Sequence, residues 1–333
     1  MSAVLQSVGF ACPRCHGVLD AGTEAYGCAS CGAAYPVISG IPDFRVAPDP
    51  WIGIDEDRDK GLRLERETAG LGFEATVRAY WAMTPGTPDE HAGRFIAHVL
   101  EAERRSGEWL AAIDAPAKAG ECWLDLGCGT ADLAAAAGPG VEVVGLDIAF
   151  RWLIAAKCRL SERGRGGTMV CGNAEALPFP DARFDRVIAL GLLEHCDDPT
   201  PILEEVRRVL RPGGRVHVRT VNRYSLLSEP HVGVWGVGWL PRAWADRYVQ
   251  WRRGERYLHH RPLSAGELAR CLRHAGFADV RVEAARLLDA EAGRLPRALR
   301  PFATAYRRLS RAAVSAPVAR RVAPLLEAEG AAP

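Results

Sequence analysis

The chain has 333 residues, of which 48% are hydrophobic and 25% are charged, and its formal net charge is +1. The length allows one large domain with appendages, the composition is that of an ordinary globular protein, and the near-neutral charge does not favour general nucleic-acid binding. No apolar run approaches the roughly 20 residues of a membrane span, and the chain opens without a charged-then-apolar leader. We therefore expect a cytoplasmic protein.

Four of the ten cysteines form two CxxC pairs, Cys12 with Cys15 and Cys28 with Cys31. Four thiolates at this spacing satisfy the tetrahedral coordination of Zn²⁺. A module of about 40 residues buries too little core to fold unaided, so a bound metal would supply folding energy. Disulfides are the alternative, and they fit poorly with a cytoplasmic chain. We predict a structural zinc module over residues 1–44, without an open coordination position for catalysis.

The next stretch reads as a linker followed by helices. Residues 45–55 contain two prolines and a glycine, which is typical of a linker. Residues 56–83 mix charged and apolar residues and predict a helix that is broken near Gly70. Thr87, followed by proline, has the pattern of a helix start. We place a linker and helical cap at residues 45–86.

The stretch from Glu121 to Asp147 has the pattern of a nucleoside-binding unit. An apolar strand over Cys122–Leu126 leads into a turn that contains Gly127 and Gly129, and after a helix a second strand ends on Asp147. Glycines in such a turn let a ligand approach the backbone, and an acid about 20 residues further on accepts hydrogen bonds from ribose hydroxyls. The third glycine of dinucleotide sites is missing, which favours a ligand without a pyrophosphate.

Further elements follow in the order that an open α/β sheet requires. We expect helices over Trp152–Leu160, Thr200–Leu210 and Ser264–Gly276, and strands over Thr168–Cys171, Phe184–Leu190, Arg215–Val221 and Asp279–Leu287. Ligands bind at the carboxyl ends of the strands in such sheets.

The segment LDLGCGTAD, which begins at Leu124, closely resembles motif I of the class I S-adenosylmethionine (SAM) dependent methyltransferases, in particular those with a type 11-like domain. The resemblance extends over roughly residues 90 to 285 and includes GNAEALPF from Gly172, the LEH step that ends at His195, and LRPGG over residues 210–214. It implies a Rossmann-like α/β fold with a seven-stranded, mostly parallel sheet and helices on both faces. We assign the methyltransferase domain to residues 87–288.

By this resemblance SAM is the methyl donor. The residues that would hold it are Asp125, Gly127, Cys128, Gly129, Asp147, Ile148, Asn173, Ala174 and Leu190. Family members more often carry aspartate where this chain has Asn173. An amide oxygen at that position accepts from the adenine amino group, and its NH₂ donates to a ring nitrogen.

The segment YPVISGIPDF over residues 35–44 resembles the end of the small zinc-ribbon proteins that activate RNA and protein methyltransferases. This resemblance supports the zinc module at the four cysteines.

Residues 222–262 form an insertion that a minimal Rossmann-like domain does not require. Its aromatic residues are Tyr224, Trp235, Trp239, Trp244, Tyr248, Trp251 and Tyr257, and a helix is expected over Pro241–Arg252. Beside the ligand edge of the sheet, such a segment suits a lid over a flat or apolar acceptor. The alternative is that the aromatic residues only pack the insertion against the domain.

Methyl transfer from a sulfonium is an in-line displacement, and a general base is needed only for hydroxyl or similar acceptors. The candidate bases are His231 and His195, with Glu229 and His259 behind them. For His195, orientation of the loop after the strand is the alternative role.

Residues 289–333 are rich in arginine and are expected to form a basic helical extension, with helices over Arg297–Ala313 and Pro317–Leu326 and a frayed end. Such a surface suits RNA phosphates, an acidic acceptor or a membrane surface, and the alternative is that it is simply solvated. The leading interpretation is a methyltransferase that acts on a small-molecule acceptor, such as a specialised or lipid-like metabolite. The alternatives are an rRNA or tRNA methyltransferase that uses the zinc ribbon and basic tail, and a SAM-binding scaffold without catalysis. The sequence leaves the acceptor atom and the oligomeric state open.

Overall fold

The computed structural model describes residues 9–84, 89–113, 117–293, 300–310, 312 and 316–333. Contacts within the chain define two compact units, which are described separately below. Unit 1 comprises Met1–Val187 and Arg208–Arg211, and unit 2 comprises Ile188–Arg207 and Pro212–Pro333. The predicted helix start at Thr87 lies outside the described residues.

The strands of the described residues form two sheets. The four-stranded sheet contains β1 (Leu19–Ala21), β2 (Ala25–Cys28), β3 (Ala34–Ile38) and β4 (Ile41–Pro42). The strands of the seven-stranded sheet are β5 (Cys122–Leu126), β6 (Glu142–Asp147), β7 (Thr168–Cys171), β8 (Phe184–Leu190), β9 (Leu210–Val221), β10 (Ala278–Ala284) and β11 (Leu325–Ala331). Their order is β10-β11-β9-β8-β5-β6-β7.

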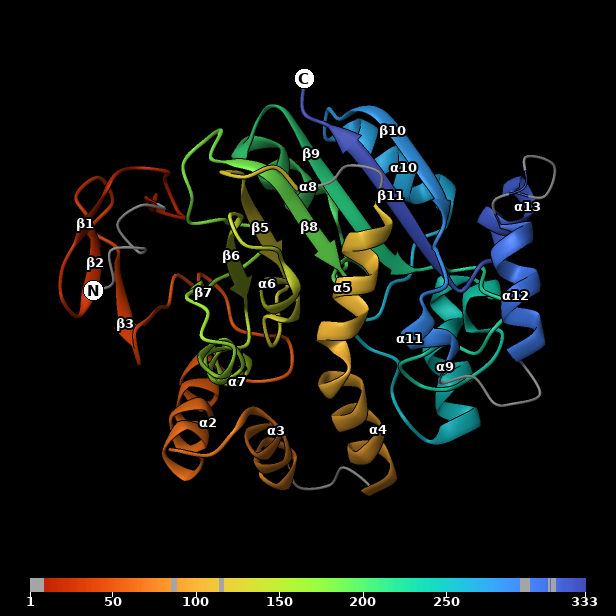
Figure 1. Cartoon of the computed structure of the whole chain (residues 1–333), viewed down its shortest axis with the longest axis horizontal. Coiled ribbons are helices and arrows are strands. Elements are labelled where there is room, and N and C mark those ends of the chain that lie inside the picture. Colours follow the sequence, from red (N-terminus) through yellow and green to blue (C-terminus); the bar gives the residue numbers. More distant parts are fainter. Residues whose placement is uncertain (1–8, 85–88, 114–116, 294–299, 311, 313–315) are drawn as a thin grey trace. The chain divides into compact units, whose positions relative to one another are not determined.

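The pairing directions agree with the predicted mostly parallel α/β sheet. Strands β5, β6 and β7 are parallel, whereas β11 is antiparallel to both of its neighbours, β9 and β10 (Figure 1). The bounds of β5, β7 and β8 are those predicted from the sequence. These strands are buried runs bounded by glycines and turns, which makes their ends visible in the sequence.

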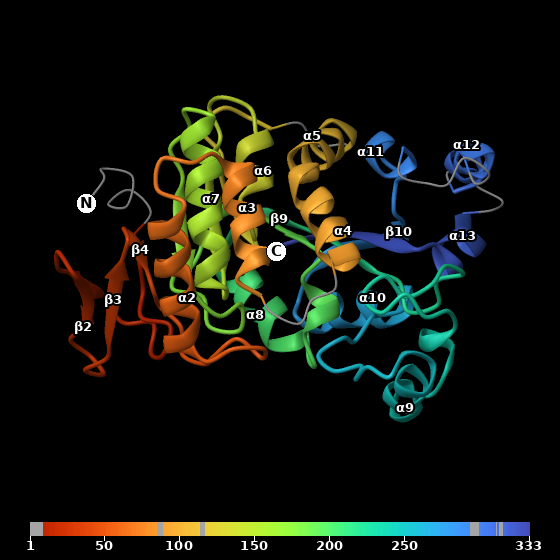
Figure 2. The same ribbon diagram turned by 90° about the horizontal axis from the view of Figure 1, so that it is seen from below.

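Helices cover the parallel strands of unit 1. They are α2 (Ile54–Glu67), α3 (Phe73–Ala82), α4 (Asp89–Leu100), α5 (Ala102–Ala112), α6 (Asp132–Ala136) and α7 (Phe150–Glu162). Helices α2 and α3 both pack against α7, and Figure 2 shows the three side by side. The predicted break near Gly70 is confirmed, because this residue lies between α2 and α3 with a φ of 76°.

The four-stranded sheet is joined to β7 through the residues that follow β4. Asp43 forms a parallel β-bridge with Cys171, and the backbone N–H of Phe44 donates to the carbonyl of Cys171 at 2.8 Å. The ring of Phe44 lies 5.3 Å from both Tyr26 and Tyr35, which forms an aromatic core inside the small module. The last residues of the module therefore lie along β7, at the edge of the parallel strands of unit 1.

Unit 2 holds most of α8 (Thr200–Val209) and the remaining helices. These are η1 (Leu193–His195), η2 (Val237–Trp239), α9 (Arg242–Arg253), α10 (Ala265–His274), α11 (Asp289–Ala292), α12 (Arg300–Leu309) and α13 (Ala316–Val322). The predicted helices of the insertion and of the stretch from Ser264 correspond to α9 and α10.

The prediction for the end of the chain is wrong. Instead of a helix to Leu326 and a frayed end, the last residues form β11, which lies between β9 and β10 (Figure 1). Leucine, glutamate and alanine favour helices locally, but hydrogen bonding to strands on both sides overrides that preference. Burial alternates along β11, with Leu326 and Ala328 buried, as expected for a strand.

The strand predicted over Arg215–Val221 is longer in the structure, because β9 begins at Leu210 and includes the LRPGG segment. The N–H of Gly213 donates to the carbonyl of Ala332, and the N–H of Ala332 donates to that of Gly214, both at 2.8 Å. The chain end is thus hydrogen-bonded to this segment, in which Gly213 has a φ of 78°.

Candidate active site

The glycine turn after β5 is fastened to the end of β6. The N–H groups of Gly127 and Cys128 both donate to the carbonyl of Leu146, at 2.8 and 3.0 Å. Gly127 and Gly129 have φ angles of 77° and 48°, in the left-handed region that glycine adopts without strain. The turn therefore lies against β6 with its backbone partly accessible to a ligand.

Asp147 at the end of β6 is held in a defined orientation. One carboxylate oxygen accepts from the N–H of Gly129 and the other from the N–H of Ala149, both at 2.8 Å. Burial raises the pKa of Asp147, while these two backbone N–H groups act in the opposite direction. The side chain remains partly accessible. Its remaining lone pairs fit the ribose hydroxyls that the sequence assigns to it.

Asp125 and Cys128 are buried beneath the turn. Burial raises the pKa of the Asp125 carboxyl well above its usual range, and the neighbouring Asp132 and Asp147 add to this effect. A Cβ atom added to Gly145 on β6 would lie 2.9 Å from Sγ of Cys128, so this thiol fills the space beneath the turn. Both side chains support the turn from inside.

Asn173 follows β7, and its amide is bonded to the segment after the small module. Its Oδ1 accepts from the N–H groups of Val46 and Ala47, at 2.9 and 3.2 Å, and its Nδ2 donates to the carbonyl of Ala47 at 3.3 Å. The amide thus holds residues 46–47 in place, and its contact with adenine stays a prediction. Ala174 is partly accessible.

The other two residues assigned to the donor lie at strand ends. The carbonyl of Ile148, directly after β6, accepts from Nη1 of Arg45 at 3.2 Å. Leu190 is the last residue of β8 and belongs to unit 2.

A buried network of charges underlies this region, and the sequence interpretation missed it. Asp57 on α2 accepts from Nη1 of Arg45 and Nη1 of Arg151, both at 2.6 Å, and from the N–H of Phe150 at 2.8 Å. Arg45 also pairs with Asp43 at 2.6 Å. The segment predicted as a linker is therefore anchored to α2 and to the start of α7. Its prolines indicated a loop, but no local pattern shows that its charges are buried.

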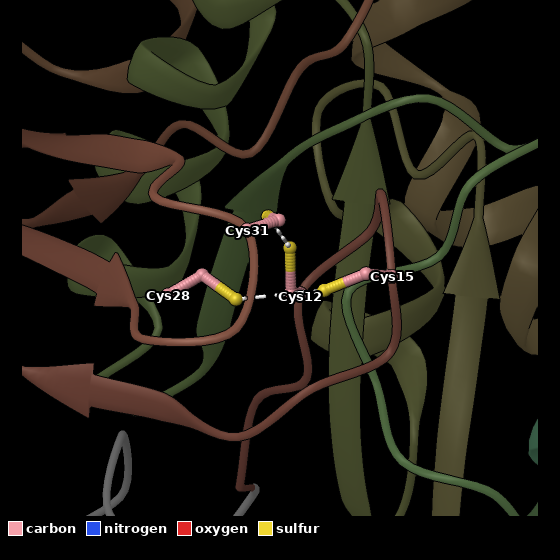
Figure 3. A group of neighbouring side chains, drawn as sticks. All are labelled: Cys12, Cys15, Cys28 and Cys31. Atoms are coloured by element: carbon pink, nitrogen blue, oxygen red, sulfur yellow. Dashed lines mark hydrogen bonds between the residues drawn. The ribbon is translucent and has the colours of Figure 1, made fainter.

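The four N-terminal cysteines converge. Sγ of Cys12 lies 3.6 Å from that of Cys31, and Sγ of Cys15 lies 3.5 Å from that of Cys28. All four sulfur atoms lie within 4.8 Å of one another, and Figure 3 shows them meeting from two loops. Thiolates held tetrahedrally at about 2.3 Å from zinc lie about 3.8 Å apart, so the donor set fits this ion.

A second cluster lies in unit 2 and contains both predicted catalytic histidines. One side-chain nitrogen from each of His195, His231 and His260 lies within 4.8 Å of the other two. The structure brings His260 into the cluster in place of its neighbour His259, which the sequence interpretation had chosen. Adjacent histidines cannot be ranked from sequence, because only the turn of the loop decides which one points inward.

Glu229 orients His231. Its Oε1 lies 2.5 Å from Nδ1 of His231, while its Oε2 accepts from the N–H groups of His231 and Val232, at 2.9 and 3.0 Å. Burial acts to lower the pKa of His231, but the hydrogen bond to Glu229 outweighs it and the pKa is raised. Burial and the nearby histidines His231 and His195 lower the pKa of His260 to about 4.

The insertion has its own small core, and its tryptophans lie outside it. Val234, Val237, Ala245 and Val249 are buried together. Exposed apolar side chains of the insertion are Leu226, Leu227, Trp235, Trp239, Trp244, Trp251 and Leu258. The indole N–H of Trp235 donates to the carbonyl of Leu226 at 3.0 Å, and that of Trp239 to the carbonyl of Ser225 at 3.1 Å. The tryptophans therefore do not serve mainly to pack the insertion.

Comparisons with known proteins identify the family. A family model described as a methyltransferase domain matches residues 124–218. A demethylmenaquinone methyltransferase from Anoxybacillus flavithermus is 34% identical over 169 residues, which is 48% of this chain and 71% of that protein. A ubiquinone biosynthesis O-methyltransferase from Idiomarina loihiensis is 30% identical over 167 residues, 48% of this chain and 62% of that protein. Among solved structures, a SAM-dependent methyltransferase from Thermotoga maritima is 19% identical with a TM-score of 0.45, covering 74% of this chain and 95% of its own.

The glycine turn, the acid at the end of β6 and these sequence relatives define a methyltransferase. The chain belongs to the SAM-dependent methyltransferases, and the predicted family and enzyme class are confirmed. Within the ranges that the structure describes, no helix combines the length and apolar character needed to cross a membrane.

Proposed function

We propose that this enzyme transfers the methyl group of SAM to an apolar small molecule that carries an ionisable hydroxyl, and that the insertion 222–262 binds this acceptor. The hydrogen bond of Glu229 to His231 is the observation that carries the proposal, because an oriented histidine is the usual base for a hydroxyl acceptor.

The donor would be held by unit 1. Asp147 would accept from the ribose hydroxyls, and the backbone of Gly127 and Gly129 would lie against the amino-acid part of SAM. Asp125 is buried beneath the turn and would not touch the acceptor.

In the proposed transfer, His231 is the base. Because the carboxylate of Glu229 can only accept, Nδ1 of His231 donates to it, and Nε2 of the neutral ring carries the lone pair. Nε2 takes the proton of the acceptor hydroxyl, and the resulting oxyanion attacks the methyl carbon. The new C–O bond forms as the C–S bond breaks, and its electron pair neutralises the sulfonium to give S-adenosylhomocysteine. His195 would assist by binding the acceptor oxygen.

The acceptor class is inferred from the exposed apolar side chains. Leu226, Leu227, Trp235 and Trp239 lie on one stretch of the insertion, and two of the indoles are anchored by hydrogen bonds. Apolar side chains gathered at the surface mark a site for an apolar partner. One relative is named for demethylmenaquinone and another for ubiquinone biosynthesis, and quinones of this type are apolar, which supports an apolar acceptor here.

We also propose that Cys12, Cys15, Cys28 and Cys31 hold one structural Zn²⁺. The fit of their sulfur atoms to a tetrahedron supports this. The ion would stabilise the module that ends beside β7 and would take no part in the transfer, since four thiolates leave no open position.

RNA is the second candidate acceptor, and one observation favours it. A cavity of about 970 Å³ in unit 2 is lined by Arg273, Arg281, Arg286, Arg320 and Arg321, among other residues. Guanidinium groups gathered in this way suit phosphates. If RNA is the acceptor, alanine at Arg320 and Arg321 together weakens RNA binding and removes transfer of label to RNA.

The small-molecule proposal is tested by replacing Trp235, the exposed tryptophan whose indole N–H donates to the carbonyl of Leu226. Trp235→Ala is expected to raise the KM for the acceptor several-fold and to leave the Kd for SAM unchanged. Trp251→Ala is the matched control, because this side chain is 76% exposed on α9 of the same insertion. Equal effects of the two changes, or a loss of SAM affinity with Trp235→Ala, would contradict the proposal.

A further inference from the structure

The three histidines of unit 2 come from separate segments of the chain and meet at one point. His195 ends η1 directly after β8, His231 lies in the first half of the insertion, and His260 lies shortly before α10. Their ring centroids lie 4.8 Å apart for His195 and His231, 5.1 Å for His195 and His260, and 4.3 Å for His231 and His260. Residues this far apart in sequence converge only where the fold brings them together.

The scaffold around the cluster fixes its geometry from both sides. The N–H of Arg261, next to His260, donates to the carbonyl of Glu194, next to His195, at 2.6 Å. The carboxylate of Glu194 is buried and accepts from Oγ1 of Thr220 on β9 at 2.7 Å. These bonds hold two of the three histidines side by side through their neighbours in the chain.

The third histidine is oriented by a carboxylate. Glu229 is 7% exposed, and both of its oxygens are engaged with His231 or the following residue. Histidines that bind metals commonly donate their second nitrogen to a carboxylate, which sets the tautomer and leaves Nε2 as the ligand. Glu229 and His231 have this arrangement.

We propose that His195, His231 and His260 bind a divalent metal ion, with zinc as the favoured ion. Imidazole is a preferred ligand of zinc, and three histidines are a known donor set for catalytic zinc with an open fourth position. Ligand nitrogens about 2.1 Å from a tetrahedral zinc lie about 3.4 Å apart. One nitrogen of each histidine lies within 4.8 Å of the others, so the distances need only a small contraction. The rings of His231 and His260 are stacked with an interplanar angle of 14°, so one of them must also rotate before both can bind the same ion.

This site is distinct from the four cysteines in place and in chemistry. It lies in unit 2 and offers nitrogen ligands, whereas the cysteine cluster lies in unit 1 and offers four thiolates. Its ligand His195 is exposed, so the fourth position is open to water or to an acceptor. The inference rests on the proposed function only for the hydroxyl acceptor. With the metal bound, His231 would be a ligand and not the base, and the metal would bind the acceptor hydroxyl, lower its pKa and let its proton pass to solvent.

The test uses the full-length protein with zinc already bound at its cysteines, titrated with Co²⁺ and followed by absorption. Co²⁺ at a histidine site gives visible d–d bands without the near-ultraviolet thiolate charge-transfer bands that mark the cysteine site. We expect one further Co²⁺ per chain. His231→Asn and His260→Asn should each weaken this binding by more than about 100-fold, and Glu229→Gln by the 10–100-fold typical of losing a partner outside the coordination shell.

His259→Asn is the matched control, because it changes the neighbouring histidine and places asparagine at a φ of 56°, which asparagine tolerates. It should bind Co²⁺ as the wild type does. If a ligand variant does not fold, the wild-type protein alone still tests the histidine site. Zn²⁺ added beyond one equivalent should raise the Tm of the wild type. No Co²⁺ uptake beyond the cysteine site, or unchanged affinity in a folded His260→Asn variant, would overturn the proposal. The Co²⁺ titration does not measure turnover, so its result can be distinguished from a failure of the proposed function.

Discussion

The carboxylate of Glu229 lies 2.5 Å from Nδ1 of His231, and both residues belong to the insertion 222–262. The same carboxylate accepts from two backbone N–H groups of the loop, so the side chain is fixed before any ligand binds. An insertion with exposed indoles and an oriented histidine combines an apolar surface with a proton acceptor. That combination distinguishes the proposed acceptor site from the proposed donor site at the glycine turn and Asp147.

Glu229→Gln should lower kcat for methyl transfer by about 10²-fold or more, because an amide can place the wrong tautomer of His231 in the site. The Kd for SAM should not change. Glu255→Gln, an exposed carboxylate of the same insertion, serves as the control. The rate of methyl transfer is measured with labelled SAM. An unchanged kcat would show that His231 does not act as the base.

Cys28→Ser should release the zinc of the N-terminal module and lower the Tm, because the module has little core apart from its aromatic cluster. Cys271→Ser, which changes a single cysteine on α10, should keep the metal. Zinc analysis by mass spectrometry measures the loss. A Cys28→Ser protein that retains this zinc and its Tm would refute the structural metal.

Asp57→Asn should reduce the free energy of unfolding by about 3–5 kcal/mol, because it leaves two buried guanidinium groups short of their carboxylate. Glu67→Gln on the same helix changes an exposed ion pair and should cost at most about 0.5 kcal/mol. Urea unfolding monitored by circular dichroism compares the two. Similar costs would show that the network contributes nothing beyond a surface pair.

Glu267 gives a pH dependence. Burial acts to raise its pKa, but hydrogen bonds from Ser264 and Arg242 lower it to about 2. Since the pKa in the unfolded chain is about 4.3, its stabilising effect is complete above about pH 5 and is lost as the pH falls towards 2. Glu267 also pairs with Arg223 at 3.3 Å and with Arg242 at 3.0 Å, which anchors the insertion to α10.

Glu267→Gln should therefore be less stable than the wild type at pH 7, and this difference should shrink between pH 5 and pH 3. Glu204→Gln, at an exposed position of α8, should show no such trend. Urea unfolding at the three pH values provides the measurement. A difference that stays constant with pH would mean that the Glu267 carboxylate does not stabilise the fold through its charge.

The parallel strands and the donor turn were predictable because they are local patterns. Buried apolar runs bounded by glycines define β5, β7 and β8, and the acid at the end of β6 lies at its expected place. The strand β11 was not predictable from the sequence, because its residues favour a helix and only its pairing with two neighbouring strands makes it a strand. The four cysteines were found from spacing alone.

The candidate acceptor site was predictable only in part. His195 and His231 stood out as histidines near the ligand edge and in the insertion, but their meeting with His260 depends on contacts between distant segments. The burial of Arg45 and Asp57 was equally hidden, because charged residues in a loop read as solvated until the fold places them together. Long-range packing decides both features.

The most direct test of the account is methyl transfer from labelled SAM, with apolar metabolite extracts and rRNA offered side by side. Label should enter a molecule that partitions into organic solvent. Asp147→Ala should abolish this transfer and weaken SAM binding at least 10-fold in calorimetry, because it removes charge-assisted hydrogen bonds worth about 1.5–3 kcal/mol. Glu142→Gln, at the other end of β6, should retain both. Label that enters rRNA alone, or transfer that survives Asp147→Ala, would contradict the account.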